Sequence, residues 1–225
     1  MYLRIPQLLN ADTLKLVDEL IATGNFKDGA ETTGIPTKSV KKNVQLDLES
    51  HPQREEFLRQ VTQAVNENPI IRSAAIPRRM TLPLVSKYGP GMSYGWHIDN
   101  ALMFAMGNPV RSDLACTIFI SNKKDYDGGD LMVRTASGDI RAKLERGDAF
   151  LYPATSRHQV TEVTSGERLA IVFWIQSMIA DVGKREILHD LGVAYDLVTR
   201  QNPTSDALQA IQRAQANLVR RWSEV

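Results

Sequence analysis

The chain has 225 residues, 43% of them hydrophobic, and a net charge of only +1. This composition permits one substantial core but excludes two full-sized domains, and the balanced charge gives no overall attraction to nucleic acid or to an anionic membrane. One cysteine, no secretory-signal pattern at the start and no apolar run of about 20 residues together favour a cytoplasmic protein without a membrane span.

The chain begins with a predicted helix over residues 11–24, where apolar side chains recur at helical spacing. We expect Asp12 to cap its start and Gly24 to end it. The following segment 28–43 is rich in Gly, Thr and Lys and has no period. It is therefore expected to be a long loop, a ragged edge strand or a flap over a binding site.

A second helix is predicted over residues 52–68, with Pro52 in its first turn. Its apolar stripe consists of side chains four residues apart, namely Phe57, Val61 and Val65. We expect residues 1–77 to form a helical support region. A basic cluster around this region is interpreted as a solvated edge; its members are Lys38, Lys41, Lys42, Arg78 and Arg79.

From about residue 80 the pattern changes to short runs rich in Val, Ile, Thr and aromatic residues, separated by turn signals. The runs fall at 80–89, 114–121, 130–135, 138–145, 147–154, 158–166 and 168–177. Because no helical pattern interrupts them, they predict a sandwich or jelly roll. We assign this mainly β domain to residues 78–178.

The C-terminal tail, residues 179–225, returns to helical patterns over 181–200 and 204–222. Thr204 or Ser205 is expected to cap the last helix. The apolar stripe of that helix consists of Leu208, Ile211, Ala214 and Leu218. We expect the tail to pack on the β domain or to form the interface of a homodimer.

Four residues of the β domain carry the strongest chemical signal. His97 and Asp99 are two positions apart, so in an extended segment both side chains project from one face and can reach one metal ion. His158 opens one predicted strand and Arg168 opens the next. If these two strands form an antiparallel hairpin, Arg168 faces back into the barrel near His158.

These residue types match a particular coordination chemistry. Two neutral imidazoles and one carboxylate leave three neighbouring positions of an octahedral ion open, which suits non-haem Fe(II) enzymes that bind an organic acid and O2. The Arg168 guanidinium would hold the far carboxylate of that acid. Two alternatives remain open: a Zn(II) hydrolase or isomerase with the same His, Asp and His ligands, and a non-enzymatic binding barrel. His51, His189 and Cys116 are interpreted as structural residues.

Three stretches carry a family resemblance: YGPGMSYGWHIDNALM, RSDLACTIFISNKKDYDGGDLMV and GDAFLYPATSRHQVTEVTSGERLAIVFWIQS. They closely resemble the PKHD-type hydroxylases, which are bacterial relatives of the prolyl hydroxylase branch of the 2-oxoglutarate and iron dioxygenases. The resemblance is strong over residues 78–178 and extends to the flanking helices. It implies a double-stranded β-helix with N-terminal helices and a C-terminal helical tail.

The resemblance also implies roles for individual residues. His97, Asp99 and His158 would bind Fe(II), and Arg168 would bind 2-oxoglutarate. Tyr88 ends the strand before the ligand loop and is expected to contact 2-oxoglutarate or to be a core or rim tyrosine, whereas Trp174 is expected to serve in packing. Prolyl hydroxylases usually have Lys where Arg168 stands, so their peptidyl-prolyl substrates are not carried over.

The sequence therefore predicts an Fe(II)- and 2-oxoglutarate-dependent dioxygenase that hydroxylates a small-molecule substrate and releases succinate and CO2. The presence of the Asp99 carboxylate favours hydroxylation, because related halogenases have Ala or Gly at that position. By the same resemblance, L-ascorbate is expected to keep the iron reduced, and an iron-linked compound such as a siderophore is the suggested substrate. O2 and 2-oxoglutarate are the expected co-substrates, and neither nucleic acid nor membrane is expected as a partner.

Overall fold

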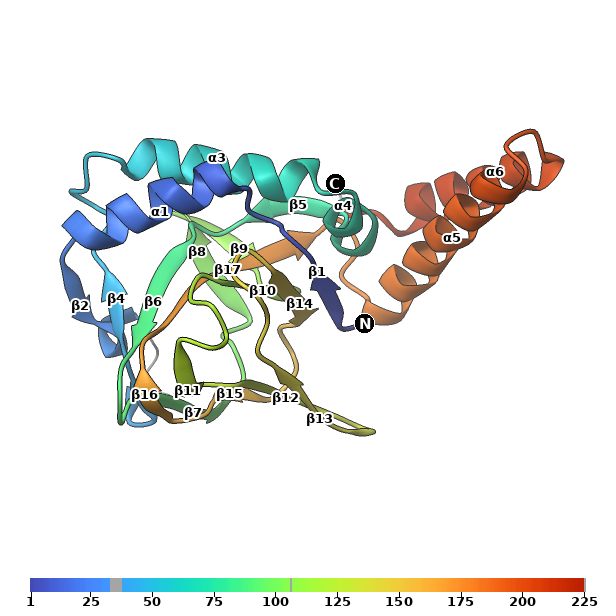
Figure 1. Cartoon of the computed structure of the whole chain (residues 1–225). Helices are drawn as coiled ribbons and strands as arrows, with labels where there is room; N and C mark the ends of the chain where they lie inside the picture. The colour runs from blue at the N-terminus through green and yellow to red at the C-terminus, as the bar shows by residue number, and fades with distance from the viewer. Residues whose placement is uncertain (33–37, 106, 225) are drawn as a thin grey trace.

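The computed structural model describes residues 1–32, 38–105 and 107–224, and shows a β barrel beneath a layer of N-terminal helices, with a helical tail at one side (Figure 1). The helices are α1 (Ala11–Thr23), the 3-10 helix η1 (Gly29–Thr32), α3 (Arg54–Glu67), α4 (Pro69–Ala75), α5 (Val182–Gln201) and α6 (Asp206–Trp222). The first strands are β1 (Leu3–Ile5), β2 (Phe26–Asp28), β3 (Lys41–Lys42), β4 (Val44–Leu46), β5 (Pro77–Met80), β6 (Leu84–Tyr88), β7 (Ser93–His97), β8 (Leu102–Ala105) and β9 (Asn108–Arg111). The later strands are β10 (Leu114–Phe119), β11 (Tyr126–Gly128), β12 (Leu131–Thr135), β13 (Gly138–Ala142), β14 (Ala149–Pro153), β15 (His158–Val160), β16 (Val163–Gly166) and β17 (Arg168–Ser177).

Two antiparallel sheets face each other in the barrel. The major sheet has the order β1-β14-β10-β17-β6-β4-β2, with β5 also paired to β17. The minor sheet has the order β13-β12-β15-β7-β3. In Figure 1 the major sheet lies beneath the N-terminal helices, and the minor sheet forms the opposite wall. This arrangement confirms the predicted double-stranded β-helix with flanking helices.

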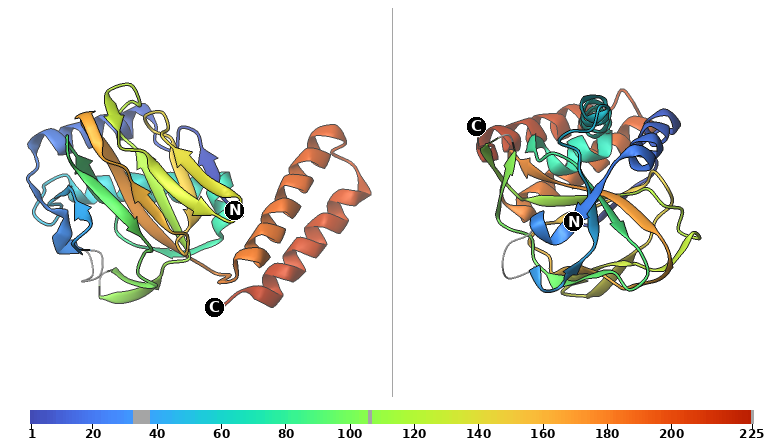
Figure 2. Two further views of the ribbon diagram at one scale, coloured as in Figure 1. Left: turned by 90° about the horizontal axis from the view of Figure 1, so that it is seen from below. Right: turned by 90° about the vertical axis from the view of Figure 1, so that its left-hand side faces the viewer.

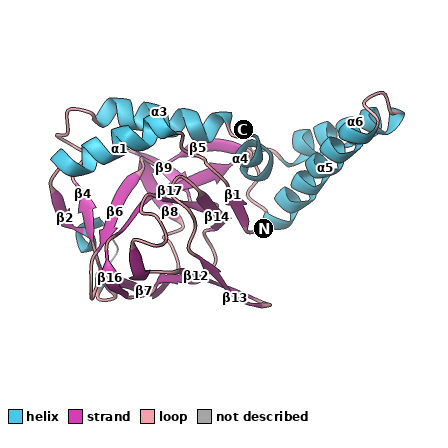
Figure 3. Ribbon diagram, in the orientation of Figure 1, coloured by secondary structure: helices cyan, strands magenta, loops and turns pink. Residues whose placement is uncertain are grey.

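The main core lies between the major sheet and the helices. Figure 3 shows α1 and α3 crossing the outer face of this sheet. Side chains at alternate positions of a strand share one face, so Ile171, Phe173 and Ile175 of β17 all enter this core. Val17 of α1 and Val61 of α3, both fully buried, pack in the same core. The amphipathic stripes of the two predicted helices are therefore what attaches them to the sheet.

The tail forms a helical hairpin that projects from the barrel (Figure 2). Its base is fixed by polar contacts, because the Arg185 guanidinium donates to the carbonyls of Ile179 and Ala180 at 2.6 and 2.7 Å. The Arg111 guanidinium of β9 also donates to the Glu224 carboxylate at 2.6 Å. Among the described helices, none has the length and apolar character needed to cross a membrane.

Several local predictions were wrong at helix starts. Asn10, and not Asp12, is the N-cap of α1, because the Asn10 side chain accepts a hydrogen bond from the Thr13 amide. Pro52 precedes α3 instead of lying in its first turn, since Gln53 is the N-cap. Gly24 and Ser205 are caps as expected. The segment 28–43 contains η1 and the edge strand β3, while its residues 33–37 lie outside the described part of the chain.

The predicted hairpin between the strands of His158 and Arg168 was also wrong. β15 pairs with β12 and β7 in the minor sheet, whereas β17 pairs with β10, β5 and β6 in the major sheet. The intervening β16 turns away to pair with β11. His158 and Arg168 thus approach the barrel interior from opposite walls, although each still faces inward.

Candidate metal centre and cofactor cavity

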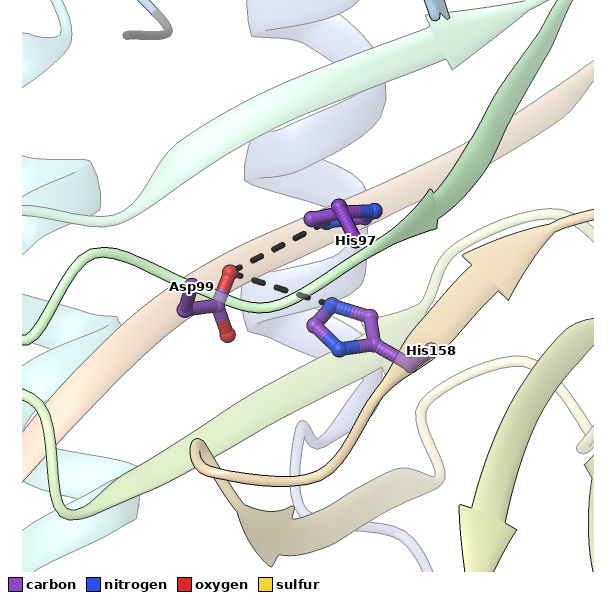
Figure 4. A group of neighbouring side chains, drawn as sticks. All are labelled: His97, Asp99 and His158. Carbon is purple, nitrogen blue, oxygen red and sulfur yellow. Dashed lines mark ion pairs between the residues drawn. The ribbon is translucent and has the colours of Figure 1, made fainter. Parts of the chain in front are cut away.

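Three side chains converge on one point of the barrel interior (Figure 4). His97 ends β7, Asp99 lies two residues beyond it, and His158 begins β15. The pairing of β7 with β15 places His97 directly opposite His158. One ligand atom from each residue lies within 4.8 Å of the others. The predicted ligand set is therefore assembled by neighbouring strands of the minor sheet.

Backbone hydrogen bonds orient both imidazoles. The Nδ1 atom of His97 lies 2.7 Å from the Gly95 carbonyl, and that of His158 lies 3.0 Å from the Ser156 carbonyl. Because a carbonyl only accepts, each Nδ1 carries the proton and each Nε2 presents a lone pair. The two Nε2 atoms lie 3.9 and 3.8 Å from Oδ1 of Asp99. In each ring, the hydrogen bond from Nδ1 to a backbone carbonyl is the kind of contact that fixes the orientation of metal-binding histidines.

Burial keeps the His97 ring neutral. It lowers the pKa of His97 to about 3, with the neighbouring His158 as a smaller cause. Only a neutral imidazole offers the lone pair that a metal needs. Near pH 7 the ring is therefore ready to bind a cation without first releasing a proton.

The Asp99 carboxylate fits the same ion. Burial raises its pKa, and His158, the Trp174 indole and Lys41 act in the opposite direction. Its Oδ2 atom is buried and has no hydrogen-bond partner among the described residues. A buried carboxylate with an unused oxygen is costly unless a cation or donor satisfies it. The donor set and this unused oxygen therefore fit a divalent metal with open coordination positions.

Arg168 lies on the opposite wall and is 1% exposed. Its guanidinium carbon lies 5.1 Å from the centre of the Tyr88 ring and 5.5 Å from that of Phe119. Within the described residues it makes no ion pair, and its Nε atom has no hydrogen-bond partner. A buried cation of this kind needs an anion, so the position fits a ligand carboxylate.

A glycine makes room for this arginine. Gly129, in the Gly-Gly turn after β11, has a φ of +63°, and a Cβ atom there would lie 3.0 Å from Cδ of Arg168. A larger residue would therefore be strained in its backbone and would press on the guanidinium stem. The turn at Gly128 and Gly129 therefore leaves room for the Arg168 side chain.

One cavity of about 490 Å³ joins the metal ligands to Arg168. Such a volume is typical of small-molecule sites. Tyr88 also lines it, opposite Arg168 in the pairing of β6 with β17, and the residue is buried. Burial raises the pKa of Tyr88 to about 12, so its hydroxyl remains protonated and can donate a hydrogen bond. His51 and His189 lie outside this lining.

Four further side chains lie close to the metal ligands. The Tyr94 ring stacks on His97 at 3.6 Å between centroids, and Tyr152 meets the His158 ring edge-on at 5.1 Å. Trp174 lines the cavity near Asp99, so it is more than the packing residue that was expected. The alternation of β17 contained the signal, because Trp174 lies an even number of positions after Arg168.

The fourth is Lys41 of β3, which was predicted to lie on a solvated edge. It is 9% exposed and lines the cavity, with its ammonium 5.3 Å from the centre of the Tyr94 ring. Burial lowers its pKa to about 8. A flap over a binding site was one expectation for segment 28–43, but the place of Lys41 beside Tyr94 depends on the pairing of β3 with β7, which joins segments about 50 residues apart.

Comparison with known proteins supports this interpretation of the site. Residues 83–176 match the model of the 2OG-Fe(II) oxygenase superfamily. The chain is 39% identical over 224 residues to a PKHD-type hydroxylase of Picosynechococcus, and 39% identical over 228 residues to one of Caulobacter vibrioides. In both comparisons 100% of each chain is covered.

Solved structures of low sequence identity share the fold. A prolyl hydroxylase of Trichoplax adhaerens, solved with a hypoxia inducible factor peptide, is 16% identical with a TM-score of 0.59, covering 83% of this chain and 86% of that one. A Pseudomonas putida prolyl-4-hydroxylase is 16% identical with a TM-score of 0.53, covering 78% and 92%. Together with the full-length relatives, these findings identify the chain as a PKHD-type hydroxylase of the 2OG-Fe(II) oxygenase superfamily, whose cofactor and co-substrate are Fe(II) and 2-oxoglutarate.

Proposed function

We propose that His97, Asp99 and His158 bind Fe(II) and that Arg168 binds the 5-carboxylate of 2-oxoglutarate, in an enzyme that hydroxylates a small molecule. The observation that carries this proposal is one cavity that joins a convergent His-Asp-His set to a buried guanidinium, which has no carboxylate partner in the described part of the chain. The His-Asp-His set supplies ligands for Fe(II), and the guanidinium supplies the positive charge that the 5-carboxylate of 2-oxoglutarate requires.

When bound, iron and 2-oxoglutarate supply the oxidising power that converts substrate C–H, O2 and 2-oxoglutarate into substrate C–OH, succinate and CO2. The residues of this chain bind, orient and exclude water. The Gly95 and Ser156 carbonyls hold the two imidazoles with Nε2 facing inward. Tyr88 keeps its proton and would donate a hydrogen bond to the 5-carboxylate of 2-oxoglutarate held by Arg168.

A small-molecule substrate is consistent with the size and shape of the cavity. Its volume of about 490 Å³ must hold both 2-oxoglutarate and the reacting part of the substrate. The two prolyl hydroxylases, one of them solved with a peptide fragment, resemble this chain at only 16% identity, which supports a shared fold and not a shared substrate. Membership in the oxygenase superfamily favours oxidation over the zinc-type hydrolysis considered from the sequence.

The proposal is tested by comparing wild type with Asp99→Ala under anaerobic conditions. We expect Asp99→Ala to lower Fe(II) affinity at least about a hundredfold in equilibrium dialysis, since even outer contacts of metal ligands contribute 10- to 100-fold. Succinate formation should fall in parallel. Asp139→Ala is the matched control, because that exposed carboxylate on β13 pairs with Arg134 away from the cavity. Full iron binding and turnover by Asp99→Ala would remove Asp99 from the site.

A further inference from the structure

An apolar surface lies at the rim of the cavity, on β8 and on the residue after β7. Ile98, Leu102 and Phe104 are 55%, 57% and 73% exposed, and all three also line the cavity that contains the metal ligands. We refer to these three side chains as the rim patch. Isolated exposed apolar residues are ordinary, but a group that borders a binding cavity marks a recognition surface.

The base of the β8–β9 hairpin is fixed, so the rim patch is held in place. Val110 of β9 is 1% exposed and stands opposite Met103, which anchors one face of the hairpin. Leu102 and Phe104 alternate onto the other face. Arg111 closes the base through two hydrogen bonds to Asp113, at 2.7 and 3.1 Å. A preorganised apolar surface loses little entropy when a ligand covers it.

The charged side chains that line the cavity limit which substrates can bind beside 2-oxoglutarate. The charged side chains in its described lining are Lys41, Asp99 and Arg168. Asp99 and Arg168 are assigned to the metal and to 2-oxoglutarate. The same lining includes the apolar side chains Leu82, Leu84 and Met103, and apolar atoms make up most of its surface. The surface available to the rest of a substrate is therefore mainly apolar.

We infer that the primary substrate carries an aliphatic or aromatic arm that remains at the cavity mouth and packs on the rim patch, while its reacting carbon reaches the metal centre. This inference rests on the proposed function and names the chemical class of its substrate. Phe104 supplies the exposed aromatic anchor, since rigid aromatic side chains contribute large contact area at low entropic cost.

The first test measures binding of the apolar dye 8-anilinonaphthalene-1-sulfonate to the anaerobic protein loaded with Fe(II) and 2-oxoglutarate. We expect Phe104→Ser to raise the dissociation constant of the dye about tenfold, and Phe104→Leu to restore most of the affinity. Leu197→Ser is the matched control, because Leu197 on α5 is 53% exposed and outside the cavity lining. Equal affinity in wild type and Phe104→Ser, or an equal loss in Leu197→Ser, would overturn the inference.

The second test uses turnover, with small metabolites of a cell extract separated by reversed-phase chromatography. We expect the retained, apolar fraction to accelerate succinate formation by wild type. In Phe104→Ser the amount needed for half-maximal acceleration should rise about tenfold, with a smaller change in the maximal rate. In Leu197→Ser neither should change. Acceleration by the unretained, polar fraction alone would contradict an apolar arm.

The outcomes separate this inference from the proposed function. If iron-loaded wild type forms no succinate with any fraction, the proposed function fails, whatever the dye shows. If succinate forms but the dye and fraction results do not depend on Phe104, only the inference fails. Sedimentation equilibrium tests whether a second copy of the chain, and not a substrate, packs on the rim patch. A dimer that dissociates in Phe104→Ser, but not in Leu197→Ser, would assign the patch to that interface and overturn the inference.

Discussion

The two faces of β17 bury side chains of opposite character. Toward the helices, Ile171 and Phe173 are completely buried among apolar neighbours. Toward the cavity, Arg168 is almost as buried but has no carboxylate partner among the described residues, and the Trp174 indole lies beside Asp99. One strand therefore serves stability on one face and ligand binding on the other.

The difference shows where this fold gains free energy and where it loses it. Burial of apolar surface in the helix-facing core stabilises the chain. Burial of the Arg168 guanidinium and of the Asp99 carboxylate oxygen, neither of which is fully satisfied among the described residues, opposes folding until ligands neutralise them. Changes on the two faces should consequently separate stability from activity.

Substitutions at two adjacent positions of β17 should give the largest difference between the two faces of the strand. Phe173→Ala should lower the free energy of unfolding by about 3–5 kcal/mol, because it leaves a cavity in the main core. Trp174→Phe should cost less than about 1.5 kcal/mol, yet lower Fe(II) affinity about tenfold by removing the indole N–H beside Asp99. Urea unfolding and anaerobic iron titration measure the two effects. A larger stability loss in Trp174→Phe would reverse the assignment of the faces.

Arg168→Ala should raise the KM for 2-oxoglutarate roughly 30- to 1000-fold, as expected when one partner of a buried charge pair is removed. Arg168→Lys should cause a smaller rise, because it retains the charge and loses the planar fork. Arg134→Ala is the control, since Arg134 is exposed and pairs with Asp139 on β13. An unchanged 2-oxoglutarate dependence in Arg168→Ala, measured by succinate formation, would reject the anchor.

The pH dependence of the free energy of unfolding measures the cost of burying the Lys41 ammonium. Its pKa falls from 10.5 to about 8 in the folded chain, so between these values the unfolded chain binds more protons. Stability contributed by this group therefore rises with pH over that window, and is lowest below pH 8. Lys41→Met should remove a rise on the order of 3 kcal/mol. Urea unfolding of the metal-free proteins at pH 8 and pH 10 measures it; parallel pH profiles would contradict a buried ammonium.

Tyr88→Phe should have the smallest effect. Loss of one neutral hydrogen bond corresponds to roughly a 2- to 12-fold rise in the KM for 2-oxoglutarate. The ring would remain over Arg168, so unfolding in urea should change little. If the KM is the same in wild type and Tyr88→Phe, Tyr88 is only a wall of the cavity and its hydroxyl does not contact the co-substrate.

The sequence predicted which candidate site residues lie around one cavity better than it predicted their neighbours. The two-residue spacing of His97 and Asp99 has a direct geometric meaning in an extended segment, so it could be recognised without a structure. Arg168 was placed correctly facing the interior, but by the wrong pairing, because local spacing does not reveal that β17 joins the opposite sheet. Lys41 was misplaced for the same reason.

The fold class followed from the run of short strands, whereas several details depended on tertiary contacts. The β8–β9 hairpin was not predicted. Its apolar residues Leu102 and Phe104 are exposed and do not pack against a core, so they do not follow the usual pattern of a strand. The cap of α1 was placed two residues late, because Asn10 and Asp12 are both good capping residues and only the Thr13 contact distinguishes them.

The most direct test of the account is succinate formation from 2-oxoglutarate after O2 is admitted to the anaerobic, Fe(II)-loaded protein, comparing wild type with His97→Ala. We expect slow succinate formation by wild type even without added substrate, and none above background by the folded variant. Gln159→Ala changes the residue beside His158 and is the control for a general effect of substitution in β15. Equal rates in wild type and His97→Ala, or no succinate from folded, iron-loaded wild type with cell extract added, would contradict the assignment of this site.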